Sequence, residues 1–272
     1  MRFHLISRQY YNIVKVVIKM INIKNNILNN VNDFDNVYII SDIHGCQDKF
    51  HEMLNKIKFN EERDLLIILG DIIDRGNHGV ELLQEIFNMN NTVLLKGNHE
   101  DMMLRSLNND MHWMSTWLKY NKGHTTLDKF LKLDKEIQKD ILKRLKELPE
   151  YLKIEINGKL YLLVHAGIRI LKGYTLDKMI EYSDILWIRY EFLKSKVETD
   201  FKVICGHTIT GLIPYEIHRT TCFLSDEELD NIIKGSEIFE DNKNKICIDC
   251  GIAYGGNLAC LELKTMNKYY VK

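Results

Sequence analysis

Apolar runs that end in polar residues recur along the chain from residue 37 onward. Five of them read NVYIISDIHG, DLLIILGDIIDRG, NTVLLKGNHED, KLYLLVHAG and DFKVICGHT. Short runs rich in valine, isoleucine and leucine are typical of strands that are buried on both faces of a sheet. Residues 48–59 and 78–89, which separate the first three runs, carry apolar side chains at helical spacing. This alternation of strand and helix predicts an α/β fold with parallel strands.

The second half of the chain carries a different pattern. Asn157-Gly158 separates two strand-like runs, which is a strong hairpin signal. Residues 245–263 hold two further strand-like runs around a glycine-rich turn. We therefore predict parallel units followed by antiparallel strands, packed as two mixed β-sheets flanked by helices. Residues 134–147 predict a surface helix, and residues 225–244 predict a surface excursion of short helix and loop.

Composition changes this picture little. Of the 272 residues, 45% are hydrophobic and 28% are charged, and the formal net charge is −1. These values are ordinary for a globular protein, so we expect no nucleic-acid partner and no membrane span. The chain has two prolines and no Gly/Ser-rich linker, which favours one compact domain over residues 37–272.

Residues 1–36 form an expected N-terminal extension. Up to Asn32 this stretch carries five basic residues and no acidic one. Its apolar part, IVKVVIKMI, is too short and too charged to span a bilayer, and it lacks the features of a signal peptide. A peripheral segment, a start codon placed too early with Met20 as the true start, and a targeting or surface-binding role remain open.

The six cysteines are scattered through apolar segments. Without a secretory signal, we expect packed, reduced thiols in a cytoplasmic protein. Cys247 and Cys250 form a C-x-x-C pair, but no second pair is present to complete a zinc site.

Polar side chains follow all five strand-like runs. Ligands in α/β folds bind beyond the carboxyl ends of the strands, so the fold should gather these side chains at one rim. Six of them are metal donors, namely Asp42, His44, Asp71, Asn98, His165 and His207. Such a mixed oxygen and nitrogen set suits manganese, iron or zinc. Six donors are too many for one open catalytic metal, and they fit two metals that share a carboxylate.

The segment GDIIDRG places Asp71, Asp74 and Arg75 within five positions. The two carboxylates repel each other unless a metal ion, an imidazolium or the guanidinium compensates their charge. One aspartate can bridge two metals, and the other can orient a histidine as outer-shell carboxylates do. Arg75 then offers its planar fork to a phosphate.

The motifs SDIHG, GDIIDRG, GNHED, VHAG and GHT occur in this order. Together they resemble the signature of the phosphoprotein phosphatase family of metallophosphoesterases over about residues 37–251. SDIHGC, KGNHEDMM and CIDCGIAYGG are similar to segments of bacterial and phage serine/threonine protein phosphatases. The resemblance implies a calcineurin-like fold and two divalent metal ions, with manganese expected and iron or zinc as alternatives.

The resemblance also implies a role for each matched residue. Asp71 would bridge the two metals, the first of which would also be held by Asp42 and His44, and the second by Asn98, His165 and His207.

Three further residues would act on the substrate, and a fourth would hold one of them. His99 would be the general acid, held by Asp74, and Arg75 would bind the phosphate. Arg189 in DILWIRYEF matches a second phosphate-binding arginine, and the alternative is a surface arginine beside a packed Trp187.

The expected activity is hydrolysis of phosphoserine and phosphothreonine in proteins by a metal-activated hydroxide. The alternatives are a dinucleoside tetraphosphate hydrolase, a phosphatase of small-molecule or nucleic-acid phosphates, and a metal-binding module without activity. The tetraphosphate hydrolases typically lack the second acid of GD-x-x-D-R-G and carry GNHD, whereas this chain has Asp74 and GNHE. Lys122 stands where the family often has the first glycine of a Gly-Gly pair, which affects the expected lid geometry.

Overall fold

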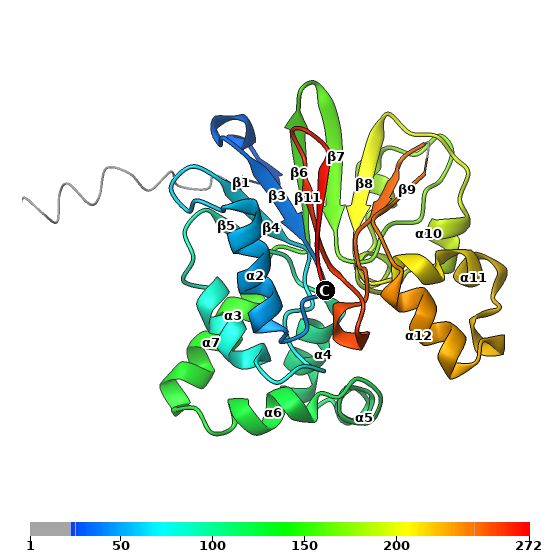
Figure 1. Ribbon diagram of the computed structural model, residues 1–272. Coiled ribbons are helices and arrows are strands. Elements are labelled where there is room, and N and C mark those ends of the chain that lie inside the picture. Colours follow the sequence, from blue (N-terminus) through cyan, green and yellow to red (C-terminus); the bar gives the residue numbers. More distant parts are fainter. Residues whose placement is uncertain (1–22, 25, 242) are drawn as a thin grey trace, which may run out of the picture.

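Two mixed β-sheets form the centre of the molecule (Figure 1). The computed structural model describes residues 23–24, 26–241 and 243–272. The seven-stranded sheet has the order β1 (Ile23–Lys24), β2 (Ile27–Leu28), β6 (Tyr151–Ile156), β7 (Lys159–Val164), β8 (Phe201–Cys205), β10 (Lys245–Cys247), β9 (Phe239–Glu240). The five-stranded sheet has the order β12 (Asn267–Val271), β11 (Leu258–Glu262), β3 (Val37–Ile40), β4 (Leu65–Ile68), β5 (Thr92–Leu94).

Each sheet contains a parallel run. Strands β3, β4 and β5 are parallel neighbours in one sheet, and β7, β8 and β10 are parallel neighbours in the other. Antiparallel strands flank both runs, with β11 beside β3 and β12 beside β11 in one sheet, and with β6 beside β7 and β9 beside β10 in the other. The prediction of two mixed sheets is confirmed, and the two parallel runs bring the ends of the predicted strands to one side of the molecule.

Helices cover the outer faces of both sheets (Figure 1). Those beside the five-stranded sheet are α2 (Gln47–Ile57), α3 (Gly79–Ile86), α4 (Asn98–Leu107), α5 (Met111–Tyr120), α6 (His124–Phe130) and α7 (Lys135–Glu147). Beside the seven-stranded sheet lie α8 (Leu176–Met179), α9 (Tyr182–Trp187), α10 (Tyr190–Lys194), α11 (Ile213–His218) and α12 (Asp226–Lys234). Short 3-10 helices are η1 (Val31–Asp33), η2 (Thr210–Leu212), η3 (Thr221–Phe223) and η4 (Ile252–Tyr254).

Alternation along the strands builds a layered core. In β3, Val37 and Ile39 pack between the two sheets, whereas Tyr38 and Ile40 pack against the helices. All four side chains are buried. A strand that is buried on both faces needs apolar residues at every position, which explains the continuous apolar runs.

The predicted hairpin forms at Asn157 and Gly158, which have φ angles of 53° and 72°. Two successive left-handed residues are the requirement of the tight turn that joins twisted antiparallel strands. The two strand-like runs of residues 245–263 become β10 and β11, which lie in different sheets. The glycine-rich turn between them therefore crosses from one sheet to the other.

Part of the expected N-terminal extension packs against the domain. Strand β2 pairs with β6, and the side chains of Leu28, Val31 and Phe34 are buried between the sheets. The predicted domain begins at residue 37, but the packed structure begins earlier in the chain. These three residues bury apolar surface that the rest of the fold would otherwise expose. The apolar stretch IVKVVIKMI lies outside the described residues.

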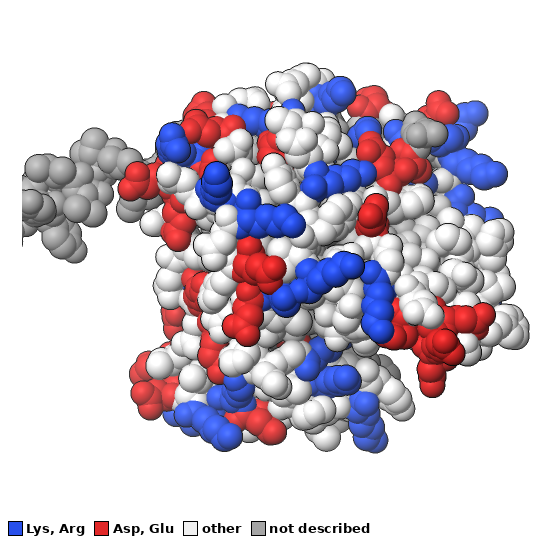
Figure 2. Space-filling view, in the orientation of Figure 1, with Lys and Arg blue, Asp and Glu red and all other residues white. Residues whose placement is uncertain are grey.

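The surface carries mixed charge. On the face shown in Figure 2, lysines and arginines are interspersed with acidic residues, and acidic side chains gather over α12, whose first turn holds Asp226, Glu227 and Glu228. Among the described residues, none of the helices combines the length and the apolar character that crossing a membrane requires. All six cysteines are free thiols.

Candidate active site

The predicted site residues follow the carboxyl ends of five strands that lie in both sheets. Strands β3, β4 and β5 lead into Asp42 and His44, Asp71 to Arg75, and Asn98 and His99, and strands β7 and β8 lead into His165 and His207. Contacts join the two sheets at this rim. His165 Nδ1 lies 2.9 Å from the carbonyl oxygen of Leu69, and the backbone N–H of His207 donates to Asp42 Oδ2 over 3.0 Å.

Six of these residues have a left-handed backbone. Their φ angles lie between 48° and 69°, at Asp42, His44, Asp71, Asp74, Arg75 and His207. In non-glycine residues this conformation costs roughly 1–3 kcal/mol and persists only where the surroundings impose it. Such a concentration at the ends of adjacent strands is typical of functional sites.

Glu100 holds two of the loops in place. Its buried carboxylate accepts hydrogen bonds from the backbone N–H groups of Asp71 and Ile72, both at 2.9 Å, and of Gly97 at 3.0 Å. Glu100 is the third residue of α4 and bonds back to the N-cap, as in a capping box. The sequence interpretation used Glu100 only to distinguish families and missed this positioning role, although GNHE carries the spacing of the capping box.

Asp71 lies at the centre of the site. Its Oδ2 atom is 3.5 Å from His165 Nε2, 3.6 Å from His44 Nε2 and 3.8 Å from His99 Nε2. Two groups of buried side chains have the spacing of metal ligands, namely His44, Asp71 and His99, and Asp71, His165 and His207. Asp71 belongs to both groups, which is the arrangement that a carboxylate shared between two cations requires.

Around the second group, which consists of Asp71, His165 and His207, hydrogen-bond acceptors outnumber the protons that could be donated to them. His165 Nδ1 faces the Leu69 carbonyl and must carry the proton there, so His165 Nε2 presents a lone pair. That lone pair faces Asn98 Oδ1 at 2.8 Å, and Asp71 Oδ2 lies close by. His207 Nδ1, 3.1 Å from Asn98 Oδ1, can supply at most one proton to these atoms. A cation bound by all four would satisfy them, so the residues present fit a divalent metal of the manganese, iron or zinc type.

An arginine lies against the first group, which consists of His44, Asp71 and His99. His44 Nδ1 lies 2.8 Å from the carbonyl oxygen of Ile73, so His44 Nε2 presents a lone pair to the site. The guanidinium of Arg75 lies against that atom and donates to His99 Nε2 over 3.0 Å. The group of ligand-like spacing includes His99 where the prediction had Asp42. Asp42 is buried close by, with its Oδ2 bonded to the Ser41 hydroxyl, and its assignment as a metal ligand stays a prediction.

His99 and Asp74 form a fully buried pair. His99 Nδ1 lies 2.6 Å from Asp74 Oδ2, and neither side chain is exposed. Two further donors hold the carboxylate, because Trp117 Nε1 donates to Oδ2 over 2.7 Å and the Thr126 hydroxyl donates to Oδ1 over 2.6 Å. With Nδ1 engaged, His99 Nε2 is the nitrogen that faces the site.

Trp117 has a second function beside packing. It lies in the helical core with no exposed surface, and its indole N–H bonds Asp74. The indole ring can occupy this place only because residue 123 is a glycine. A Cβ atom at residue 123 would lie 2.5 Å from Trp117 Nε1. Lys122 precedes it with a φ angle of 56°, a conformation that glycine adopts without strain.

Burial and neighbouring charges shift the pKa values of the site. Burial, and then the neighbouring carboxylate of Asp249, raises the pKa of Asp42 to about 8, and burial raises the pKa of Asp74 to about 7. Burial also raises the pKa of Asp71 well above its usual value. Burial and then Arg75 lower the pKa values of His44 and His99. Neutral imidazoles present lone pairs to a cation, and a bound cation would in turn lower the pKa values of the buried aspartates.

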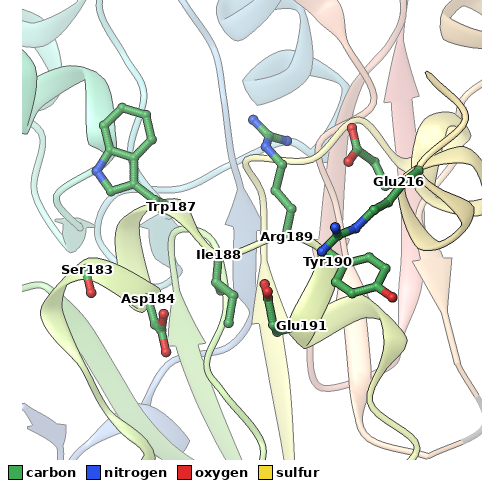
Figure 3. Close-up of a pocket in the computed structure, with 9 residues that line it drawn as sticks. Ser183, Asp184, Trp187, Ile188, Arg189, Tyr190, Glu191 and Glu216 are labelled. Atoms are coloured by element: carbon green, nitrogen blue, oxygen red, sulfur yellow. The ribbon is translucent and has the colours of Figure 1, made fainter. Parts of the chain in front are cut away.

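Arg189 and Asp249 complete the rim. Arg189 Nη1 donates to the carbonyl oxygen of His207 over 2.7 Å and to the Thr208 hydroxyl over 2.9 Å, so its guanidinium is fixed at the site. Figure 3 shows this guanidinium pointing away from Asp184. Asp249 is buried after β10 and lines the same cavity as both Arg75 and Arg189. The sequence interpretation missed Asp249, although CID ends an apolar run just as the other five clusters do.

Comparisons with known proteins agree on the family. A model of the calcineurin-like phosphoesterase family matches residues 36–247. Serine/threonine-protein phosphatase 2 of Salmonella typhimurium is 26% identical over 237 residues, which cover 85% of this chain and 94% of that protein. A symmetrical bis(5'-nucleosyl)-tetraphosphatase of Buchnera aphidicola is 30% identical over 132 residues, or 48% of this chain and 44% of that protein.

The fold of this chain is also similar to that of a solved structure. The crystal structure of a candidate diadenosine tetraphosphatase superimposes with a TM-score of 0.62 at 18% identity. The superposition covers 90% of this chain and 96% of that one. At this level of identity the likeness shows the fold alone.

Proposed function

Since the chain belongs to the calcineurin-like phosphoesterase family, a family of metal-dependent hydrolases, we propose that it is a phosphomonoesterase acting on phosphoserine and phosphothreonine in proteins. The proposal places it in the cytoplasm, where its six free thiols would stay reduced. Manganese is the proposed metal at both positions, and reconstitution with manganese, iron and zinc in turn would identify the metal that supports turnover.

One observation carries the choice of substrate class, namely the buried pair of His99 and Asp74. An alkoxide that leaves from phosphoserine or phosphothreonine is a poor leaving group and needs a well-held proton donor. A polyphosphate leaving group is far more stable and needs less help. A histidine whose Nδ1 is held by a carboxylate, itself held by two further donors, suits monoesters of alcohols.

Six residues would hold the two metal ions. Asp42, His44 and Asp71 would hold one cation, and a second would be held by Asp71 together with Asn98, His165 and His207. The cations, when bound, supply an activated water and offset the negative charge of the phosphoryl oxygens.

Three side chains would act on the substrate itself. Arg75 and Arg189 bind the phosphate, for which the planar guanidinium is suited. A phosphate dianion beside His99 raises the pKa of that histidine, and His99 Nε2 then donates its proton to the leaving oxygen. Asp74 stabilises the imidazolium and fixes the orientation of the ring.

The extent of the similarity to relatives also supports a protein phosphatase. The similarity to the Salmonella serine/threonine phosphatase extends over almost the whole length of both chains, whereas the chain spans less than half of the Buchnera tetraphosphatase. A dinucleoside tetraphosphate hydrolase remains the second candidate. It is favoured by the higher local identity of that shorter match.

A comparison of two substrates tests this proposal. With manganese, kcat/KM for a phosphothreonine peptide should exceed kcat/KM for diadenosine tetraphosphate at least about tenfold. The held proton donor assists the departure of an alkoxide, whereas it gives a polyphosphate leaving group little assistance. Both should be measured on the same metal-loaded preparation. A tenfold preference for the dinucleotide would instead establish the second candidate, with the metal site unchanged.

The support of Asp74 leads to a further prediction. Thr126→Val keeps the volume but removes the hydroxyl that donates to Asp74 Oδ1 and accepts from the Asp74 N–H. We expect the free energy of unfolding to fall by about 1–3 kcal/mol, because a buried N–H loses its partner. We also expect kcat to fall more for alkyl than for aryl phosphates. Thr125→Val is the matched control, since the Thr125 hydroxyl bonds only the Lys122 carbonyl, and equal effects of both substitutions would contradict the positioning role.

A further inference from the structure

A cavity of about 430 Å³ opens beside the phosphate-binding arginines. Arg75, Arg189 and His207 are among its lining residues, so the cavity is continuous with the proposed catalytic centre. Its volume is within the range of cavities that bind small ligands. A group attached to a phosphate held by Arg75 and Arg189 would therefore reach the cavity directly.

Apolar side chains form much of the cavity wall, namely Ile209 and Leu212 after β8, Leu229 and Ile233 of α12, and the ring of Tyr254. Thr208, Glu216, Thr221 and Asp249 complete the lining. Tyr254 is 44% exposed, and the guanidinium of Arg75 lies 5.1 Å from the centre of its ring. An apolar surface beside a cationic phosphate site recognises a ligand that has a phosphate and an apolar group close together.

Helix α12 holds this wall in place. Ser225 and Glu228 form a capping box at its start, and its acidic first turn faces outward over the surface shown in Figure 2. At its end, the Ser236 hydroxyl accepts from the N–H of Gly211 over 3.2 Å and donates to the Ile232 carbonyl. A Cβ atom at residue 211 would lie 2.5 Å from that hydroxyl. The close approach joins α12 to η2, so the wall is part of the packed structure.

We propose that this cavity binds an apolar side chain that neighbours the phosphorylated residue in the substrate. The inference rests on the proposed protein-phosphatase function and names the sequence preference of that same site. In an extended peptide the chain rises about 3.2–3.4 Å per residue, so a residue within two positions of the phosphothreonine can reach a cavity that begins at the phosphate. Burial of a leucine or phenylalanine side chain there would strengthen binding roughly ten- to hundredfold.

A second hollow, of about 600 Å³, also contacts Arg189 (Figure 3). It shares Arg189 and Glu216 with the first but lacks Arg75 and His207, so it touches only one of the two arginines proposed to bind the phosphate. Its lining mixes Trp187, Ile188 and Tyr190 with Asp184 and Glu191. The preference is therefore assigned to the cavity that α12 lines.

A peptide panel tests the inference on the metal-loaded, full-length enzyme. Phosphothreonine peptides would carry either leucine or serine at each of the two positions on either side of the phosphothreonine. At one of these positions, kcat/KM for the leucine peptide should exceed that for the serine peptide by about tenfold or more. A ratio near one at all four positions would overturn the inference.

A substitution in the wall then locates the preference. Leu229→Asp should reduce the leucine-to-serine ratio at the selective position to below about threefold, because it places a carboxylate in the apolar wall. Leu131→Asp is the matched control, because Leu131 is 54% exposed and lies outside the cavity lining. Thermal unfolding checks both variants, and Leu229→Ser replaces the first if it does not fold. An unchanged ratio in the Leu229 variant would contradict the assignment.

The panel also separates the two proposals. Hydrolysis of every phosphopeptide with equal efficiency overturns the sequence preference and leaves the protein-phosphatase function intact. Hydrolysis of p-nitrophenyl phosphate or diadenosine tetraphosphate without any phosphopeptide overturns that function, and the preference with it.

Discussion

Replacement of Asp71 by asparagine is expected to abolish turnover and to remove bound metal. The Asp71 carboxylate lies within 3.5–3.8 Å of three imidazole nitrogens and belongs to both groups of ligand-like spacing. The asparagine amide has one oxygen atom where the carboxylate has two. It is also neutral, so it no longer compensates the charge of two cations. Since loss of an outer-shell partner alone costs about 10- to 100-fold, loss of the shared ligand should lower kcat by more than about a hundredfold.

Two measurements test this result together, namely the metal content after dialysis and kcat on p-nitrophenyl phosphate. Asp177→Asn is the matched control, because the Asp177 side chain is 76% exposed and the substitution is chemically the same. The control should retain wild-type values of both. An Asp71 variant that kept two metals and near-normal turnover would refute the central position of this carboxylate.

The second large effect is expected at His99. His99→Asn should lower kcat by roughly 10²–10⁴-fold, the typical contribution of a general acid. The loss should be greatest for alkyl phosphates and small for aryl phosphates, whose leaving groups are stable without a proton. This dependence follows from the position of His99 Nε2, which faces the site while Nδ1 is held by Asp74.

Metal content decides between two roles for His99, because its spacing also allows ligation. A general acid can be removed with the metals retained, whereas a ligand cannot. We expect about two metals per chain in the His99 variant and in His112→Asn, the control at an exposed histidine. Equal losses on aryl and alkyl phosphates, or the loss of one metal, would rule out the role of general acid.

Much of the fold follows from local patterns. Continuous apolar runs predicted β3, β4, β5, β7 and β8, and Asn157-Gly158 predicted the hairpin between β6 and β7. The charged helical pattern of residues 134–147 became α7. These elements depend on residue spacing and on turn residues with positive φ, which are properties of short stretches of chain. The packing of Leu28, Val31 and Phe34 carried no such signal, because single apolar residues in a polar stretch have no periodicity to detect.

The sequence by itself determined which residues stand at the ends of the predicted strands, and so predicted a common rim that holds His44, Asp71, His99 and His165. Order along a strand is a local property, and parallel strands bring their carboxyl ends together. Only the tertiary structure decided what holds those residues. Glu100 organises two loops, Trp117 and Thr126 hold Asp74, and α12 supplies an apolar wall beside Arg189. These contacts join segments distant in the chain, and such pairings depend on how the layers pack and not on any local pattern.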